Sequence, residues 1–159
     1  MLSVHSYISK HASLAPIPED DSVTSECSAE QVEKAITTAV RKGIFDMVNA
    51  ERMAHQRKPF KRSRFLDGLA SIHANYMAEQ RSAIHSVQSI VQLQVILHSK
   101  LVAENVQQGE HIRDMHNCTM TAQSSLSRQN ILSKHFHEMG CAVARGSDGK
   151  IYLCQLFRK

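Results

Sequence analysis

The sequence predicts an α+β domain in which helices come first and strands follow. Three observations predict this class. Apolar residues recur at three- and four-residue steps between positions 32 and 77, which is the spacing of amphipathic helices. Near the end, two apolar segments flank a Gly-Ser-Asp-Gly turn, which is typical of a β-hairpin. The chain has 159 residues, 42% of them hydrophobic, and this suits one globular domain, which we assign to residues 29–159.

The first segment, residues 1–28, is interpreted as a flexible, disordered tail. It mixes Ser, Pro, His and acidic residues and has no helical or strand period. It also lacks the uninterrupted apolar run of a secretory signal peptide. No part of the sequence approaches the roughly 20 apolar residues of a membrane-spanning helix, so no transmembrane segment is expected. We therefore expect a cytosolic chain, a chain that has lost its leader, or a fragment.

The first helix is expected to begin after residues 28–31 (SAEQ), which match a capping box. It should continue to about Ala54, with Gly43 as the point where it could break. Its predicted buried stripe consists of Val32, Ile36, Val40, Ile44, Met47 and Val48.

A second helix is expected to begin at Ser63 as its N-cap. Its predicted buried stripe consists of Phe65, Leu66, Leu69, Ile72, Tyr76 and Met77. His73 lies beside this stripe and is assigned to packing and hydrogen bonding. The basic segment 57–64 separates the two helices, and Pro59 within it blocks helix continuation. We interpret this segment as a solvated linker, with an anion-binding surface as the alternative.

The middle of the chain is less regular. Residues 90–97 alternate between apolar residues and Gln, which favours a half-buried strand, with a helix as the alternative. Residues 109–122 are predicted to be helical. A further helix should start at Ser124 or Ser125 and stop at Gly140. It carries Leu126, Ile131, Leu132 and Phe136.

The closing hairpin pairs residues 141–145 with residues 150–157 across the turn. If Arg145 pairs with Lys150, then Cys141 faces Cys154, and a disulfide between them would be geometrically allowed. Two small buried thiols are the alternative, which we favour because the chain shows no leader peptide.

Five blocks of sequence, taken together, are similar to a known family. They are residues 47–52 (MVNAER), 69–78 (LASIHANYMA), 103–106 (AENV), 130–132 (NIL) and 139–149 (MGCAVARGSDG). From about residue 44 to its end, the chain resembles the CAP superfamily of cysteine-rich secretory proteins, antigen 5 and group-one plant pathogenesis-related proteins. The short bacterial-type SCP domains of that family are the most similar. The resemblance implies a three-layer α-β-α sandwich.

The resemblance also implies a cleft with two His and one or two Glu residues, which binds a divalent metal in some members. The first His of that motif falls on His85, and its Glu falls on Glu104. The position of the second His holds Ser127, and the Trp usual before it is absent. His85 and Glu104 are therefore the candidate metal ligands, with help from His116, His135 or His137. Because zinc sites normally use three or more protein ligands, we expect a degenerate cleft.

The function implied is a non-catalytic binding module for a lipid, sterol, glycan or protein partner. The family is usually extracellular, whereas this sequence shows no signal peptide, so the resemblance alone does not assign a compartment. No cofactor is expected, and zinc or another divalent metal is the alternative. The alternative function is a metal-dependent or proteolytic hydrolase that uses His85 and Glu104. A nucleophilic Ser125 or Ser127 is disfavoured because no Gly-x-Ser-x-Gly motif is present. Nucleic acid is not expected as a partner, since the net charge is only +4.

Overall fold

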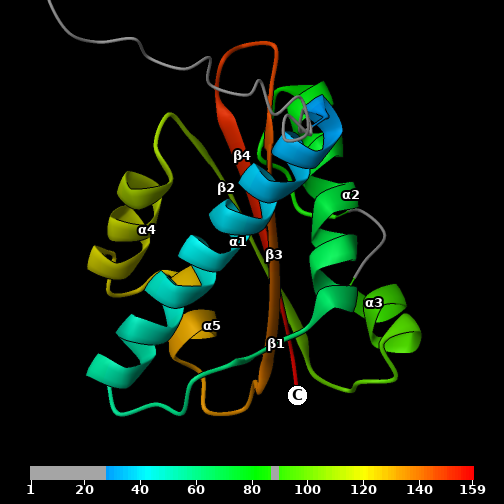
Figure 1. Cartoon of the computed structure of the whole chain (residues 1–159). Coiled ribbons are helices and arrows are strands. Elements are labelled where there is room, and N and C mark those ends of the chain that lie inside the picture. The colour runs from blue at the N-terminus through cyan, green and yellow to red at the C-terminus, as the bar shows by residue number, and fades with distance from the viewer. Residues whose placement is uncertain (1–27, 87–89) are drawn as a thin grey trace, which may run out of the picture.

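The protein is a sheet of four strands covered by helices on both faces (Figure 1). The computed structural model describes residues 28–86 and 90–159. The strand order is β1-β3-β4-β2, in which β1 is parallel to β3 and the other neighbours are antiparallel. The strands are β1 (Lys61–Arg62), β2 (Val102–Gly109), β3 (Glu138–Arg145) and β4 (Ile151–Arg158).

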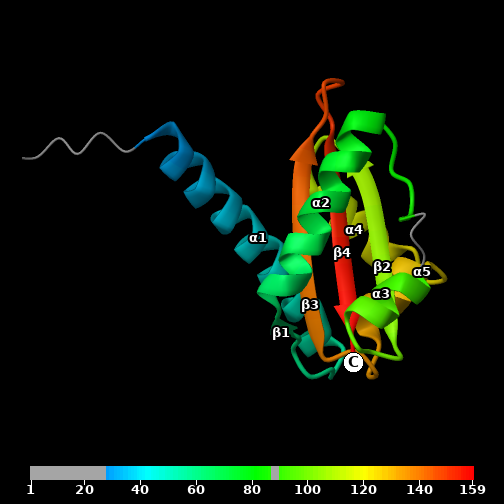
Figure 2. The same cartoon turned by 90° about the vertical axis from the view of Figure 1, so that its right-hand side faces the viewer.

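The helices form the two outer layers. On one face lie α2 (Arg64–Gln80) and α3 (Ile90–Ile96), and on the other lie α1 (Ala29–Ala54), α4 (Ile112–Thr121) and α5 (Leu126–Leu132) (Figure 2). This arrangement confirms the three-layer α-β-α sandwich. Within the described ranges, no helix is both long and apolar enough to cross a membrane.

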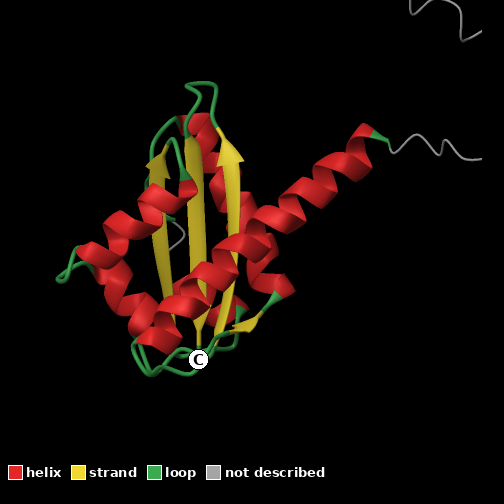
Figure 3. Cartoon of the chain, turned by 60° about the vertical axis from the view of Figure 1, so that its left-hand side comes forward, coloured by secondary structure: helices red, strands yellow, loops and turns green. Residues whose placement is uncertain are grey.

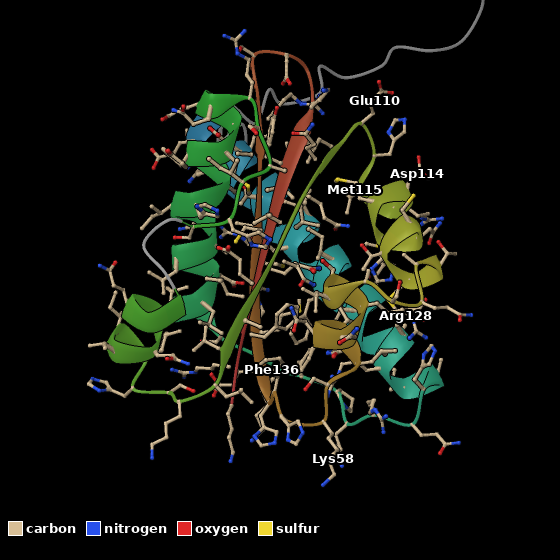
Figure 4. The ribbon with its side chains drawn as sticks, turned by 180° about the vertical axis from the view of Figure 1, so that it is seen from behind. Lys58, Glu110, Asp114, Met115, Arg128 and Phe136 are labelled. Atoms are coloured by element: carbon tan, nitrogen blue, oxygen red, sulfur yellow. The ribbon has the colours of Figure 1, made fainter. Side chains whose placement is uncertain are left out.

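The sheet separates two hydrophobic cores, because alternate side chains of a strand point to opposite faces. The core under α2 and α3 includes Tyr152, Cys154 and Leu156 of β4. The core under α1, α4 and α5 includes Leu153 and Phe157 of the same strand. Met115 of α4 belongs to this second core and lies close to the end of β2 (Figure 4).

The long helix α1 begins where the capping box predicts. The Ser28 side chain accepts a hydrogen bond from the Gln31 backbone N–H, and the Gln31 side-chain oxygen accepts one from the Ser28 backbone N–H. The helix is continuous through Gly43, so the predicted break is wrong. Its C-terminal half crosses the sheet obliquely (Figure 3), whereas its N-terminal half projects from the body (Figure 2). Val32 and Ile36 are therefore 43% and 57% exposed, contrary to the predicted stripe. The remainder of the predicted tail, residues 1–27, lies outside the described residues.

Helix α2 begins after Ser63, whose side chain accepts a hydrogen bond from Leu66, as predicted. Its buried face differs from the predicted stripe. The residues against the sheet are Leu66, Ala70, Ala74, Met77 and Ala78, whereas Phe65, Ile72 and Tyr76 are exposed. The alanines allow the helix to approach the strands closely. Gly140 of β3 lies directly below, and a Cβ atom there would come within 2.4 Å of the backbone of Leu66 and Asp67.

Two later predictions need correction. Residues 90–96 form a helix, which is the alternative interpretation, and not the favoured half-buried strand. Helix α5 is capped by Ser125 and ends at Leu132 instead of Gly140. The chain leaves the helix so that Phe136 can enter the core beside Phe157, at a ring-centroid distance of 5.9 Å. Gly140 then belongs to β3. The helix predicted over 109–122 is confirmed as α4.

The hairpin is confirmed, but its register differs by one residue. Gly149 adopts φ 79° in the turn, and Arg145 pairs with Ile151. Cys141 therefore faces Gln155, and Cys154 faces Ala142. A one-residue shift places a side chain on the other face of the sheet, so the two thiols lie in different cores. The prediction that Cys141 faces Cys154 is wrong, whereas the favoured interpretation of two small buried thiols is confirmed.

Burial keeps both thiols protonated. It raises the pKa of Cys141 to about 12, with nearby Asp67 adding to the effect. Burial likewise raises the pKa of Cys154 well above its usual value, and Glu104 contributes in the same direction. Since the thiolate is the reactive form of cysteine, neither residue is suited to be a nucleophile.

Arg52 connects the C-terminal end of α1 to the loop that follows it and to the C-terminal end of α5. Its Nε lies 2.7 Å from the carbonyl oxygen of Lys58, and its Nη1 lies 2.5 Å and 2.9 Å from those of Ile131 and Ser133. The guanidinium also stacks 3.6 Å from the ring centroid of Phe60. Burial, with a smaller effect of Arg57, lowers the pKa of Arg52 to about 10, so the side chain stays charged at neutral pH. Figure 4 shows Lys58 and Phe136 at this same end of the molecule.

Candidate functional site

His85 and Glu104 come together, as predicted from the resemblance. Their side chains form a hydrogen bond of 3.1 Å between Nδ1 of His85 and Oε2 of Glu104. The same oxygen accepts the backbone N–H of Ser86 at 3.0 Å. Strand β2 points Glu104 toward the α2 and α3 layer, where its side chain is only 5% exposed, whereas His85 is 72% exposed. The carboxylate is therefore the fixed group of the pair.

His73 is the third polar residue of this cluster. Its Nε2 lies 2.9 Å from the carbonyl oxygen of Ile84 and 3.6 Å from Oε1 of Glu104. The predicted hydrogen-bonding role is confirmed, but its place beside Glu104 was not anticipated. The Cys154 sulfur lies 3.9 Å from the same oxygen. Oε1 of Glu104 thus has only long contacts, while Oε2 has two ordinary hydrogen bonds.

Ser127 is held on the other side of β2. Asn105, the residue after Glu104, points to α5 and donates from Nδ2 to the Ser127 carbonyl at 3.0 Å. Asn130 donates to Asn105 at 2.9 Å. Among the described residues, the Ser127 hydroxyl forms no hydrogen bond with His85 or Glu104. Ser125 serves as the N-cap of α5. Neither serine is therefore brought together with the histidine as a nucleophile would be.

The other histidines considered as ligands lie elsewhere. His116 is on α4, with its Nε2 3.9 Å from Glu51 of α1. Burial lowers its pKa, and the nearby Glu51 opposes this effect. His135 and His137 are exposed in the segment that leads into β3. None of the three histidines joins Glu104.

The residues present do not fit a family-type metal centre. His85 and Glu104 supply two donors, and His73 already contacts the Ile84 carbonyl. Zinc sites normally use at least three protein ligands. In the part of the chain that the structure describes, no group of three or more His, Cys, Asp or Glu residues is arranged to hold a metal ion.

A pocket of about 450 Å³ opens beside Glu104. Its walls are mostly large apolar side chains of α2 and α3, and its polar end is Glu104 with His73. The lining residues are Leu69, Ile72, His73, Tyr76, Ser86, Gln92, Leu93, Ile96, Glu104 and Leu156. The pocket therefore combines an apolar cavity with one buried carboxylate.

The sequence contains a signal for this pocket that differs from the predicted apolar stripe of α2. The large apolar residues of α2 are spread over more of the helix surface than a single core-facing stripe covers. Meanwhile Ala70, Ala74 and Ala78 recur every four residues, which marks a closely packed face. The face with small residues contacts the sheet, and Ile72 and Tyr76 are left to line the pocket.

The basic segment 57–64 is partly used for structure. Arg57 donates to the Leu132 carbonyl at 3.0 Å. Arg62 pairs with Asp67 at 2.9 Å, and the other Asp67 oxygen accepts the Cys141 N–H. Lys58, Lys61 and Arg64 are exposed. The segment contains strand β1 at the edge of the sheet and connects α1 to α2. Only part of its positive charge is therefore available to bind a partner.

Comparison with known proteins identifies the family to which a domain with this fold and with the His85–Glu104 pair belongs. Residues 45–157 match the family described as "CAP: Cysteine-rich secretory protein family". Because this match covers most of the sequence, the chain belongs to the CAP family. A search of curated proteins finds no significant match.

Solved structures share the fold at low sequence identity. An outer surface protein of Borrelia burgdorferi has a TM-score of 0.64 and 16% identity, over 74% of this chain and 90% of that one. A cysteine-rich secretory protein of Staphylococcus aureus has a TM-score of 0.61 and 21% identity, over 77% and 38%. An extracellular SCP-domain protein of Bacillus anthracis has a TM-score of 0.65 and 16% identity, over 86% and 45%. The present chain thus corresponds to less than half of the last two proteins.

Proposed function

We propose that this CAP domain is a non-catalytic binding module for a small amphipathic molecule of the lipid or sterol class. The observation that carries the proposal is the apolar pocket that ends at Glu104. Ile72, Tyr76 and Ile96 are large apolar side chains that remain exposed around it, although burial would stabilise them. An apolar ligand would cover these side chains, whereas a glycan would place polar hydroxyl groups against them.

The polar end defines the head group of the ligand. Oε1 of Glu104 has only long contacts with His73 and Cys154, so it can accept a further hydrogen bond. A carboxylate accepts hydrogen bonds and attracts cations. The preferred ligand therefore carries a hydroxyl or an amino group at one end of an apolar body.

Among the described residues, no serine or cysteine side chain forms a hydrogen bond with His85, as the nucleophile of a hydrolase would. His85 and Glu104 resemble a base and its orienting carboxylate. The thiol beside them, Cys154, is buried, and burial raises its pKa, so it stays protonated. Ser127 contacts Asn105 through its backbone on the other side of β2. A candidate base with no nucleophile hydrogen-bonded to it supports binding better than catalysis.

A displacement assay tests the pocket with Nile red as the apolar probe. We expect Ile96→Asp to raise the Kd for Nile red at least tenfold, which corresponds to about 1.4 kcal/mol. A charge in an apolar pocket loses hydration without a partner. Dodecylamine and dodecanol should displace the dye better than dodecanoate, whose carboxylate faces Glu104.

Val95→Asp is the matched control. Val95 is 68% exposed and does not line the pocket, while Ile96, next to it on α3, is 51% exposed and does. Both variants should retain the wild-type circular dichroism spectrum. Equal loss of dye binding in the two variants, or none in either, would overturn the assignment of the pocket.

Zinc titration by calorimetry tests the metal alternative separately. We expect no micromolar binding, because His85 and Glu104 provide fewer donors than a zinc site uses. His135→Ala is the control for loss of an exposed histidine outside the cluster. Micromolar heat that disappears in His85→Ala and persists in His135→Ala would contradict the non-metal interpretation.

A further inference from the structure

Three segments that meet at one end of the molecule carry its excess of positive charge. They are residues 54–62, 98–101 and 133–137, and together we call them the basic end. They hold six of the 19 Lys and Arg residues and none of the 15 acidic residues, so the rest of the chain has a net charge of −2. The six residues are Arg57, Lys58, Lys61, Arg62, Lys100 and Lys134.

Backbone hydrogen bonds hold the three segments side by side across the end of the sheet. The Lys61 N–H donates to the carbonyl of His137 at 2.8 Å, and the His137 N–H donates to that of Arg158 at 2.9 Å. The Lys159 N–H then donates to the Leu101 carbonyl at 3.1 Å. Figure 1 shows the connections that lead into β1, β2 and β3 at this same end. Charges that are far apart in the sequence are thus gathered on one surface.

Most cations of the basic end are available to a partner. Within residues 28–86 and 90–159, Arg62 is the only one of the six that forms a salt bridge, with Asp67. The other five are exposed, and they are Arg57, Lys58, Lys61, Lys100 and Lys134. An anionic surface would therefore meet five cations without displacing an intramolecular carboxylate.

Large apolar side chains are exposed beside these cations. Phe65, in the first turn of α2, is 54% exposed, and Leu101, next to Lys100, is 36% exposed. Met53 in the last turn of α1 and Val95 near the end of α3 are 58% and 68% exposed. A nucleic acid or a sulfated glycan would place charged and polar groups against these side chains. A lipid bilayer offers anionic head groups directly above apolar acyl chains, so it matches both kinds of residue.

We propose that the basic end binds the surface of a membrane that contains anionic phospholipids. The lysines would lie among the head groups, while Phe65 and Leu101 would enter the boundary between head groups and acyl chains. Near an anionic bilayer, each Lys or Arg strengthens binding roughly fivefold. The proposal does not depend on the apolar pocket beside Glu104.

Sedimentation of the full chain with lipid vesicles tests the proposal. The chain should bind vesicles of phosphatidylcholine with about 30% phosphatidylserine, and it should not bind vesicles of phosphatidylcholine alone. Lys58→Gln with Lys61→Gln and Lys134→Gln should weaken this binding at least about a hundredfold. Raising the NaCl concentration from about 0.1 M to about 1 M should release the protein, because the Debye length falls from roughly 10 Å to roughly 3 Å.

The matched control is Lys34→Gln with Arg113→Gln and Lys150→Gln. These three residues are exposed, lie outside the basic end and form no salt bridge within the described residues, so the net charge changes equally. Both triple variants should keep the wild-type circular dichroism spectrum. Equal weakening in the two would show that only net charge matters, and a wild-type chain that ignores phosphatidylserine would disprove the proposal.

The apolar residues distinguish a membrane from other polyanions. Phe65→Ser with Leu101→Ser should weaken vesicle binding at least about tenfold, while retention on a heparin column stays unchanged. Ile36→Ser is the control, because Ile36 is 57% exposed and lies on the projecting half of α1. If the lysine variant loses vesicle binding and the Phe65 and Leu101 variant does not, the partner is a soluble polyanion such as a nucleic acid or a sulfated glycan, and the membrane assignment is wrong.

Discussion

Replacement of Arg52 by Met is expected to lower the free energy of unfolding by about 3 kcal/mol, a large part of the 5–15 kcal/mol typical of a domain. The variant keeps a similar apolar volume but removes every donor. The carbonyl groups of Lys58, Ile131 and Ser133 would then lose the guanidinium that they share. The contact with the Phe60 ring would lose its cation as well.

This effect can be measured by urea denaturation followed by circular dichroism. Arg57→Met is the matched control, because Arg57 is exposed and, among the described residues, its side chain makes one hydrogen bond, to the Leu132 carbonyl. Its loss should cost less than about 1 kcal/mol. Similar urea midpoints for the two variants would show that the hydrogen bonds from Arg52 to the three carbonyls add little to the stability of the domain.

Gly140→Ala is expected to destabilise the domain by about 2–4 kcal/mol, somewhat above the usual cost of overpacking. The new methyl group would lie 2.4 Å from the carbonyl carbon of Leu66 and from the nitrogen of Asp67. These are backbone atoms of α2, so no side chain can rotate to make room. The helix must move away from the sheet, which also disturbs the hydrogen bond between Asp67 and the Cys141 N–H at 2.9 Å.

The control is Gly68→Ala on the same helix. A Cβ at Gly68 meets no atom within 4 Å, so only the helix propensity changes. That change should stabilise the protein by roughly 0.5–1 kcal/mol. Opposite shifts in thermal midpoint are therefore expected from two chemically identical substitutions. A stable Gly140→Ala variant would mean that α2 packs less closely than the structure indicates.

Local chemistry in the sequence predicted where helices begin. Ser28 with Gln31, and Ser63, are caps whose partners lie within three residues, so tertiary structure is not needed to recognise them. The capped helices therefore begin where they were predicted. The predicted stripes were less accurate because burial depends on what lies opposite. Nothing in the pattern around Ile36 shows that α1 extends beyond the sheet, and nothing around Ile72 shows that a pocket lies beside it.

The register of the hairpin could not be obtained from its turn alone. Several loop lengths are compatible with a Gly-Ser-Asp-Gly turn, and each one changes which residues face one another. The observed register is consistent with the close approach of α2, since it places Gly140 opposite Leu156 and below Leu66. In the candidate site, motif resemblance correctly brought His85 to Glu104. It did not indicate His73, whose place depends on the packing of α2.

Cys141 and Cys154 lie on opposite faces of the sheet, so a disulfide between them would require the strands to move. The described part of the chain has three cysteines, and all three are free, so its two cores are held by packing and hydrogen bonds without a cross-link. For the residues that the structure describes, we therefore expect the two cores to be the same in the presence and in the absence of a reducing agent.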